Sequence, residues 1–179
     1  MTDQKSRLLD VVVATYDNIN SAETDAQAVK AFFKTLGGRQ NFDAVIVSKN
    51  DKGKVRIERK FDEGTRHAAL EGAGFGLAAG FVAALFPPIG IAAALTAGGV
   101  GGTAIGALVG HVQSSISRSD LKKFGDELDN STAALIVVYE TSLAEQVARN
   151  IKARKHVVAK LKDLAVEDLA ERMRESQSA

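Results

Sequence analysis

The feature that most constrains this chain is a run of 38 residues, 73–110, that contains no charged side chain. The proline pair at 87 and 88 interrupts the run, and proline inside a helix removes a hydrogen bond and kinks or breaks the helix. It separates two arms, 66–86 and 89–115, each close to the roughly 20 apolar residues that a membrane-spanning helix needs. We therefore expect a helical hairpin over residues 63–117. Its predicted tip comprises Phe86, Pro87, Pro88 and Ile89.

The glycines of both arms recur at every fourth residue. Residues four apart lie on one face of a helix, and small residues on such a face let two helix backbones approach closely. Glycine in a water-exposed helix costs about 1 kcal/mol relative to alanine, so this spacing is favourable only where helices are packed and dehydrated. The pattern predicts a glycine zipper through which copies of the chain form a homo-oligomer. The predicted packing residues are Gly72, Gly76, Gly80, Gly98, Gly102, Gly106 and Gly110.

The composition of the charge-free run leaves the surroundings of the hairpin open. Only 13 of its 38 residues are Leu, Ile, Val or Phe, so insertion as an independent span is marginal. Three arrangements are expected: a hairpin that crosses the bilayer, a hairpin that dips into it, and a soluble oligomer that buries its hairpins. Basic residues flank both ends of the run, which favours a cytoplasmic membrane location with the polar parts facing the cytoplasm. The candidates for contact with lipid headgroups are Arg59, Lys60, Arg66, Arg118 and Lys122.

The chain before the hairpin has the pattern of a strand, a helix and two further strands. The apolar run at residues 8–16 predicts a central strand. Asn20 is the expected cap of an amphipathic helix that ends at the glycine pair 37–38. Residues 42–61 predict two antiparallel strands joined by a turn at 51–54.

The chain after the hairpin adds a helix and a strand. Ser119 or Asp120 is expected to cap a short helix that ends near residues 129–130, and the apolar run 133–140 predicts another buried strand. The resulting order predicts an α+β fold of the ferredoxin-like sandwich type (βαββαβ), in which helices cover one face of an antiparallel sheet.

A C-terminal αβα extension is expected beyond the sandwich. It consists of a helix from Ser142, an edge strand over residues 156–161 and a helix over 166–174. The predicted division of the chain is the first part of the sandwich at 1–62, the inserted hairpin at 63–117, and the second part with the C-terminal helices at 118–179.

Composition excludes several functional classes. Lys and Arg number 23 and Asp and Glu number 22, so the basic excess expected of a nucleic-acid binder is absent. The chain has no cysteine for a thiolate metal site or nucleophile, and the start of the sequence lacks a signal-peptide pattern, which favours the cytoplasm. The glycine runs at 72–76 and 98–102 lack the strand and the basic residue of a phosphate-binding loop. No catalytic, cofactor-binding or metal-ligating residue is nominated, and we expect a protein that is not an enzyme and needs no cofactor.

The run FDAVIVSKNDKGKVRIERKFDEGTRHAALEGAGFGLAAG, followed by a Phe-Pro tip, a second Gly/Ala arm and LKKFGDELDNSTAALIVVYE, resembles the bacterial DUF1269 family of proteins of unknown function. The resemblance covers about residues 42–140 and extends more loosely to both ends of the chain. It implies a hydrophobic, glycine-rich hairpin that associates with membranes. It implies no enzymatic activity and no catalytic residue for this chain.

Two functional hypotheses follow from these patterns. The first is a non-enzymatic, membrane-associated structural or stress-related protein that self-associates through its glycine zippers. The second is a soluble oligomeric regulatory or ligand-sensing module in which the hairpins are buried in the assembly. The lipid bilayer is an expected partner only under the first hypothesis, and neither hypothesis identifies a small-molecule ligand.

Overall fold

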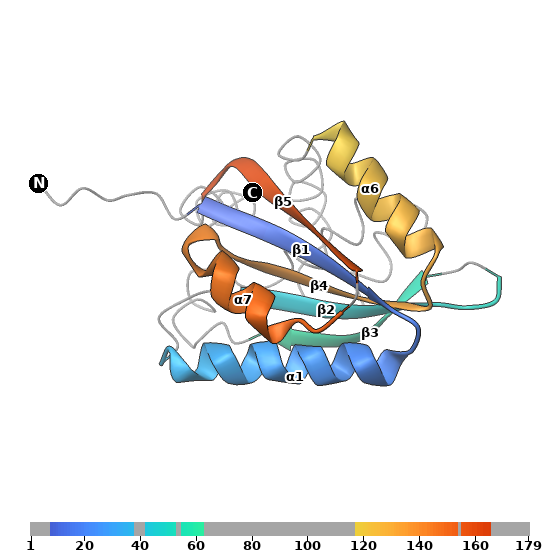
Figure 1. The fold of residues 1–179 in the computed structure, drawn as a ribbon, viewed down its shortest axis with the longest axis horizontal. Coiled ribbons are helices and arrows are strands. Elements are labelled where there is room, and N and C mark those ends of the chain that lie inside the picture. Colours follow the sequence, from blue (N-terminus) through green and yellow to red (C-terminus); the bar gives the residue numbers. More distant parts are fainter. Residues whose placement is uncertain (1–7, 38–41, 53–54, 63–116, 154, 166–179) are drawn as a thin grey trace, which may run out of the picture.

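The computed structural model describes residues 8–37, 42–52, 55–62, 117–153 and 155–165, which form a five-stranded antiparallel sheet with helices on both faces (Figure 1). The predicted α+β class is confirmed. The strands lie in the order β3-β2-β4-β1-β5. In chain order the elements are β1 (Leu8–Tyr16), α1 (Ile19–Thr35), β2 (Phe42–Lys49), β3 (Val55–Asp62), α6 (Arg118–Asp129), β4 (Ala133–Glu140), the 3-10 turn η1 (Thr141–Leu143), α7 (Ala144–Asn150) and β5 (Lys155–Ala165).

The position of each strand in the sheet follows its apolar content. β4, in the middle of the sheet, has the sequence AALIVVYE and is buried at every residue. β1 lies beside it and is buried at every residue except Leu8 and Thr15. β3 carries Arg56 and Glu58 and lies at an edge, where charged side chains reach water and hinder pairing with other chains. The predicted central strand at 8–16 and the predicted buried strand at 133–140 are both confirmed.

The sheet does not have the predicted ferredoxin-like strand order. A ferredoxin-like sheet places the third strand of the chain between the first two, whereas here β4 lies between β1 and β2, and β3 lies outside β2. The reason is burial, because a strand with neighbours on both sides suits the continuous apolar run of β4 better than the charged sequence of β3. The described elements follow one another along the chain as predicted, and the β2–β3 hairpin is confirmed, but the pairing of β4 is different.

One face of the sheet packs against α1 and α7 (Figure 1). Side chains of β1, β2 and β4 form a single buried cluster with these two helices. α7 contributes Val147 to this cluster. The residues that α1 contributes recur at helical spacing, and they are Ala22, Ala26, Val29 and Phe33.

The opposite face carries α6, which contacts β1 and β5 (Figure 1). Phe124 and Leu128 of α6 are buried there, outside the cluster of α1 and α7. The prediction that helices cover only one face is therefore wrong. Consecutive residues of β1, such as Val11 and Val12, are both buried, so the sheet has two apolar faces that need cover. Among the described helices, none combines the length and the apolar character needed to cross a membrane.

Helix α1 begins before the predicted cap. The cap is Asn18 rather than Asn20, and its Oδ1 accepts a hydrogen bond of 2.9 Å from the backbone N–H of Ser21. Asn18 has an extended backbone, which places its side chain over the first turn of the helix. The helix ends as predicted, because Gly37 adopts a φ of +69°, a conformation that glycine takes without steric cost.

Helix α6 also begins earlier than predicted, and the C-terminal elements differ in detail. Ser117, rather than Ser119 or Asp120, caps α6, and its Oγ accepts a hydrogen bond of 3.1 Å from the backbone N–H of Asp120. The helix expected from Ser142 starts as η1 and continues as α7. The predicted edge strand is β5, which pairs with β1 and is longer than expected. The helix predicted at 166–174 lies outside the described residues.

Candidate functional site

A polar cleft of about 640 Å³ opens at the end of the sheet where β1 passes into α1. Its walls come from the end of β1, the first turns of α1, the end of α6 and the connection from α7 to β5. The lining includes the hydroxyls of Ser21 and Thr24, the amides of Asn18 and Asn130, and several charged side chains. Small-molecule sites typically have volumes of roughly 300 to 1,000 Å³, so the cleft is large enough for a small ligand.

Asp25 of α1 lines this cleft and is only 4% exposed. Its Oδ2 accepts three hydrogen bonds: from the Tyr16 hydroxyl at 2.8 Å, from the Lys152 backbone N–H at 2.7 Å and from the Ala153 backbone N–H at 3.1 Å. These donors belong to β1 and to the connection between α7 and β5. The carboxylate therefore joins α1 to the neighbouring strand β1 and to the α7–β5 connection, 127 and 128 residues further along the chain.

The hydroxyl of Tyr16 is held in its protonated form. Burial of the ring raises the pKa of Tyr16 far above its ordinary value, and the hydrogen bond to Asp25 and the charge of that carboxylate raise it further. The phenol therefore donates to Asp25 over the whole physiological pH range. Tyr139 of β4 lies opposite Asp10, near the other end of β1. Burial likewise raises the pKa of Tyr139, with a smaller effect of the charge of Asp10.

Two lysines stand on the wall formed by the α7–β5 connection. The ammonium group of Lys155 lies 4.0 Å from the carboxylate of Glu127 on α6. Lys152 is exposed, and within the described part of the chain no carboxylate pairs with its side chain. The cleft thus combines a buried carboxylate on its inner wall with ammonium groups nearer to solvent.

The described residues that line the cleft carry hydroxyl, amide and charged groups. In residues 8–37, 42–52, 55–62, 117–153 and 155–165, no group of three or more His, Cys, Asp and Glu side chains is placed to hold a metal ion. The hydroxyls of Ser21 and Thr24 have the chemistry to bind a polar ligand.

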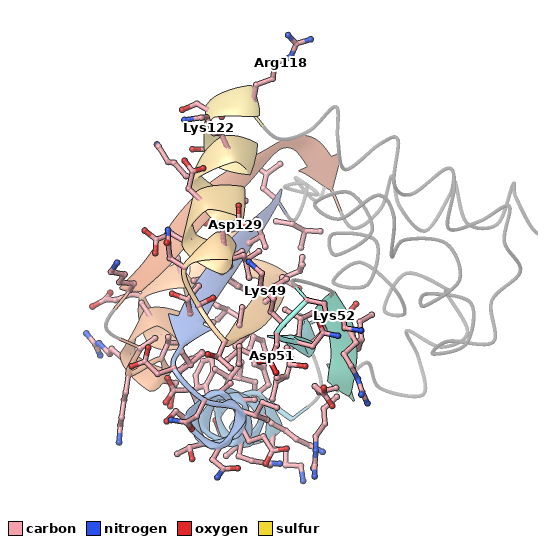
Figure 2. All side chains as sticks on the ribbon, turned by 90° about the vertical axis from the view of Figure 1, so that its right-hand side faces the viewer. Lys49, Asp51, Lys52, Arg118, Lys122 and Asp129 are labelled. Atoms are coloured by element: carbon pink, nitrogen blue, oxygen red, sulfur yellow. The ribbon has the colours of Figure 1, made fainter. Side chains whose placement is uncertain are left out.

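A second feature is the distribution of charge along α6. Arg118 lies in its first turn and Lys122 in its second, whereas Asp126, Glu127 and Asp129 lie at its end. Figure 2 shows Arg118 and Lys122 towards one end of the helix and Asp129 towards the other, near Lys49. A helix is stabilised by acidic side chains at its N-terminus and basic side chains at its C-terminus. Apart from Asp120 in the first turn, the charges of α6 have the opposite arrangement, and its last turn has no basic residue.

Opposite charges from the rest of the molecule neutralise the acidic end of α6 more fully than its basic end. The ammonium group of Lys49 lies 3.2 Å from Asp129 and also donates to the carbonyl oxygen of that residue. Near the start of the helix, Lys122 lies 3.5 Å from Asp126, but its side chain is 81% exposed and such pairs contribute little. Arg118 is exposed and forms no ion pair within the described residues.

The structure brings only some of the predicted headgroup contacts together. Arg118 and Lys122 lie on α6. Arg59 is on the other side of the sheet, where its Nε donates to the Glu23 carboxylate of α1 at 2.8 Å. Lys60 lies in β3, opposite Val45 of β2. Arg66, the hairpin tip (Phe86, Pro87, Pro88, Ile89) and the predicted zipper residues (Gly72, Gly76, Gly80, Gly98, Gly102, Gly106, Gly110) lie outside the described residues.

The sequence patterns did not identify Asp25 as a site residue. It occupies the face of α1 that carries Ala22, Ala26 and Val29, and all four residues are buried. A charged residue within the apolar stripe of a helix is rarely buried without polar partners. An aspartate within the apolar face of α1 is therefore the sequence signal that would have identified Asp25 as a candidate site residue.

Comparison with known proteins gives one family. Residues 69–177 match the model of a family described as "Protein of unknown function (DUF1269)". The match confirms the resemblance seen in the sequence, and it begins and ends further along the chain than residues 42–140. It includes α6, β4, α7 and β5 and begins after β3. No curated protein and no solved structure matches the chain.

Proposed function

The chain belongs to the DUF1269 family, and we propose that it is a non-enzymatic, membrane-associated structural or stress-related protein. In this proposal residues 63–117 form a glycine-zipper hairpin that meets the cytoplasmic membrane and packs with copies of itself. The sheet and its helices lie on the cytoplasmic side. The observation that carries the proposal is the charge distribution of α6, the helix that directly follows the proposed hairpin.

Arg118 and the acidic side chains of the last turn act against the stability of α6 itself, whereas Asp120 in the first turn acts in its favour. A charge placed unfavourably in a terminal turn costs about 0.3 to 1 kcal/mol at an exposed site. Arg118 in the first turn and the acidic side chains in the last turn all incur this cost. A basic residue close to an anionic bilayer gains about 1 kcal/mol, which offsets the cost at the N-terminal end. An anionic surface near the start of α6 thus explains why basic side chains are found there.

The sequence around the proposed hairpin also supports a bilayer near the start of α6. The proposed hairpin leads into α6 through Ser117, so the basic end of α6 is the end nearest to the charge-free run in the chain. Arg66, at the start of the first arm, supplies a further basic residue on the other side of the run. Basic residues that flank an apolar segment on both sides favour a hairpin whose two ends remain in the cytoplasm.

Self-association rests on the glycine spacing. The proposed contact between copies is the glycine face of the second arm, which includes Gly102 and Gly106. Replacing both with leucine should prevent close approach of the helices and convert an oligomer into smaller species in native mass spectrometry. Ala104→Leu adds similar bulk two residues away from the glycine face and is the matched control. An oligomer of unchanged size in the double variant would contradict the zipper.

Membrane association is tested by fractionation of the full chain. We expect the protein to float with vesicles and to remain in the membrane fraction after carbonate extraction, because an inserted hairpin resists removal by high pH. A protein that stays wholly soluble without detergent would overturn the proposal. That result would favour the alternative, in which hairpins are buried in a soluble oligomer with a regulatory or ligand-sensing role.

A further inference from the structure

We propose that the cleft at the start of α1 binds a small zwitterion, a molecule that carries an ammonium group and a carboxylate or phosphate group. The inference concerns the sheet and its helices, and it does not depend on the hairpin or on membrane association. It rests on two charged groups of the cleft, the carboxylate of Asp25 and the ammonium group of Lys152, that have no ion-pair partner among the described residues.

The first observation is the hydrogen bonding of Asp25. All three donors that reach this buried side chain bond to Oδ2, which leaves Oδ1 without a donor from the described residues. Buried polar atoms in proteins nearly always have a partner. Since Asp25 lines the cleft, a ligand seated there is in position to supply the donor.

The second observation is the absence of a counter-ion. The donors on Oδ2 are a neutral phenol and two neutral backbone amides, and none of the ion pairs among the described residues includes Asp25. A buried carboxylate is stabilised by a positive charge far more than by neutral donors. The group that completes the site is therefore an ammonium group.

The third observation identifies the other end of the ligand. Lys152 and Lys155 line the same cleft and are exposed to solvent. The side chain of Lys152 pairs with no carboxylate among the described residues, so it is available to an anionic group, and Lys155, 4.0 Å from Glu127, adds a second positive charge to the same wall. A lysine ammonium group binds carboxylate and phosphate oxygens as a point charge. A cleft of about 640 Å³ accommodates a short molecule that spans from Asp25 to these lysines. Ser21 and Thr24 also line the cleft, and the Thr24 hydroxyl, which donates to the Asn20 carbonyl oxygen at 2.9 Å, keeps its capacity to accept.

The test uses the full chain and probes that separate the two charges. O-phosphoethanolamine and β-alanine carry both groups, ethylammonium carries only the cation, and propionate carries only the anion. We expect isothermal titration to show that the two zwitterions bind at least about tenfold more tightly than either single-charge probe, because a second charge-assisted hydrogen bond is worth about that factor. Equal binding of all four probes, or binding of none, would overturn the proposal.

Variants locate the site. Asp25→Asn should reduce zwitterion affinity by about tenfold or more, because it removes the charge that pairs with the ammonium group. Asp10→Asn is the matched control, because Asp10 is a buried aspartate at the other end of β1 that accepts a hydrogen bond of 2.8 Å from the Thr141 hydroxyl. Equal loss in both variants would show a general effect of the substitution and contradict the assignment.

The exposed lysines keep the test decisive if Asp25→Asn does not fold. Lys152→Gln with Lys155→Gln should weaken binding of O-phosphoethanolamine severalfold and leave binding of ethylammonium unchanged. Unchanged binding of both probes would overturn the anionic end of the proposal. Vesicles that contain phosphatidylethanolamine present the same headgroup on a lipid. If the lipid is the natural source, these vesicles compete with free O-phosphoethanolamine for the site, and if the source is a free molecule they do not.

Discussion

Helices α1 and α6 lie on opposite faces of one sheet and differ in how their charges are placed (Figure 1). α1 has Lys34 in its last turn, where a positive charge stabilises a helix. α6 has acidic side chains and no basic side chain in its last turn, and it has Arg118 in its first. The last turn of α1 therefore carries the charge that stabilises a helix and the last turn of α6 does not, whereas in the first turn α1 has no acidic residue and α6 has Asp120 as well as Arg118. In the proposed function, an anionic surface near the start of α6 accounts for the basic side chains at that end.

The two helices also differ in how they are fixed to the rest of the molecule. α1 has the buried carboxylate of Asp25, which accepts donors from β1 and from the α7–β5 connection. α6 is joined to β2 through Lys49, at its exposed C-terminal end. α1 is thus held to the sheet by buried hydrogen bonds as well as by apolar packing. α6 packs on the sheet through two buried side chains, Phe124 and Leu128, and its outer surface is charged.

The largest expected effect concerns the buried aromatic ring that each helix contributes to its own face of the sheet. Phe33→Ala in α1 and Phe124→Ala in α6 should each lower the free energy of unfolding by about 3 to 5 kcal/mol, because each removes a buried ring. Urea denaturation of the full chain in mild detergent measures both. A loss below about 1 kcal/mol for Phe124→Ala alone would show that α6 is held much more weakly than α1.

A smaller effect is expected from the buried polar contact of α1. Tyr16→Phe removes one donor from the buried Asp25 and should cost about 1 to 3 kcal/mol. The pKa of Tyr16 is raised in the folded protein, so its contribution is complete below the pKa of about 10 of the unfolded chain and is lost as the pH rises above that value. Denaturation from pH 8 to pH 11 should show a decline that is shallower in the variant. An equal decline in both proteins would contradict the assignment.

The helix caps should contribute equally on the two faces. Asn18→Ala and Ser117→Ala should each cost about 1 kcal/mol, since each removes the acceptor of a first-turn N–H. Asn20→Ala and Ser119→Ala alter residues that do not cap and should have little effect. Thermal denaturation distinguishes the two pairs, and a larger loss in the second pair would favour the caps predicted from sequence.

The smallest expected change in stability concerns the charge in the first turn of α6. Arg118→Glu places a negative charge in the first turn of α6 and should raise the free energy of unfolding by about 0.3 to 1 kcal/mol in the absence of lipid. The same change should weaken association with anionic vesicles. Stability and binding thus move in opposite directions, and a variant that loses both would show that Arg118 serves the fold.

Much of the sheet could be predicted from periodicity, but its strand order could not. The runs 8–16 and 133–140 are apolar at consecutive positions, so their burial follows from the sequence alone. The order of elements along the chain suggested a ferredoxin-like sandwich, because that order does not record which strand fills the gap between β1 and β2. The charged residues of β3 and the apolar run that opens β4 differ in this respect, and comparing the two strands would have placed β4 in the centre of the sheet.

The candidate sites were predicted to different degrees for a physical reason. Arg118 and Lys122 could be nominated because exposed charges next to an apolar run are visible in the sequence. The cleft joins Tyr16, Asp25 and Lys152, and their proximity arises only when β1 and the α7–β5 connection meet α1. The separation of Arg59 from Arg118 likewise follows from which face each residue occupies, and chain position does not determine it.

The central claim is that the basic end of α6 faces an anionic bilayer. The most direct measurement is the partition of the full chain onto vesicles with and without anionic lipid, for the wild type and for Arg118→Glu with Lys122→Glu. The double variant should lose about tenfold or more in partition onto anionic vesicles, at about 1 kcal/mol for each basic residue removed. Lys52→Glu with Arg149→Glu makes the same charge change at other exposed sites and should partition like the wild type. Equal partition of wild type and both variants would contradict the claim.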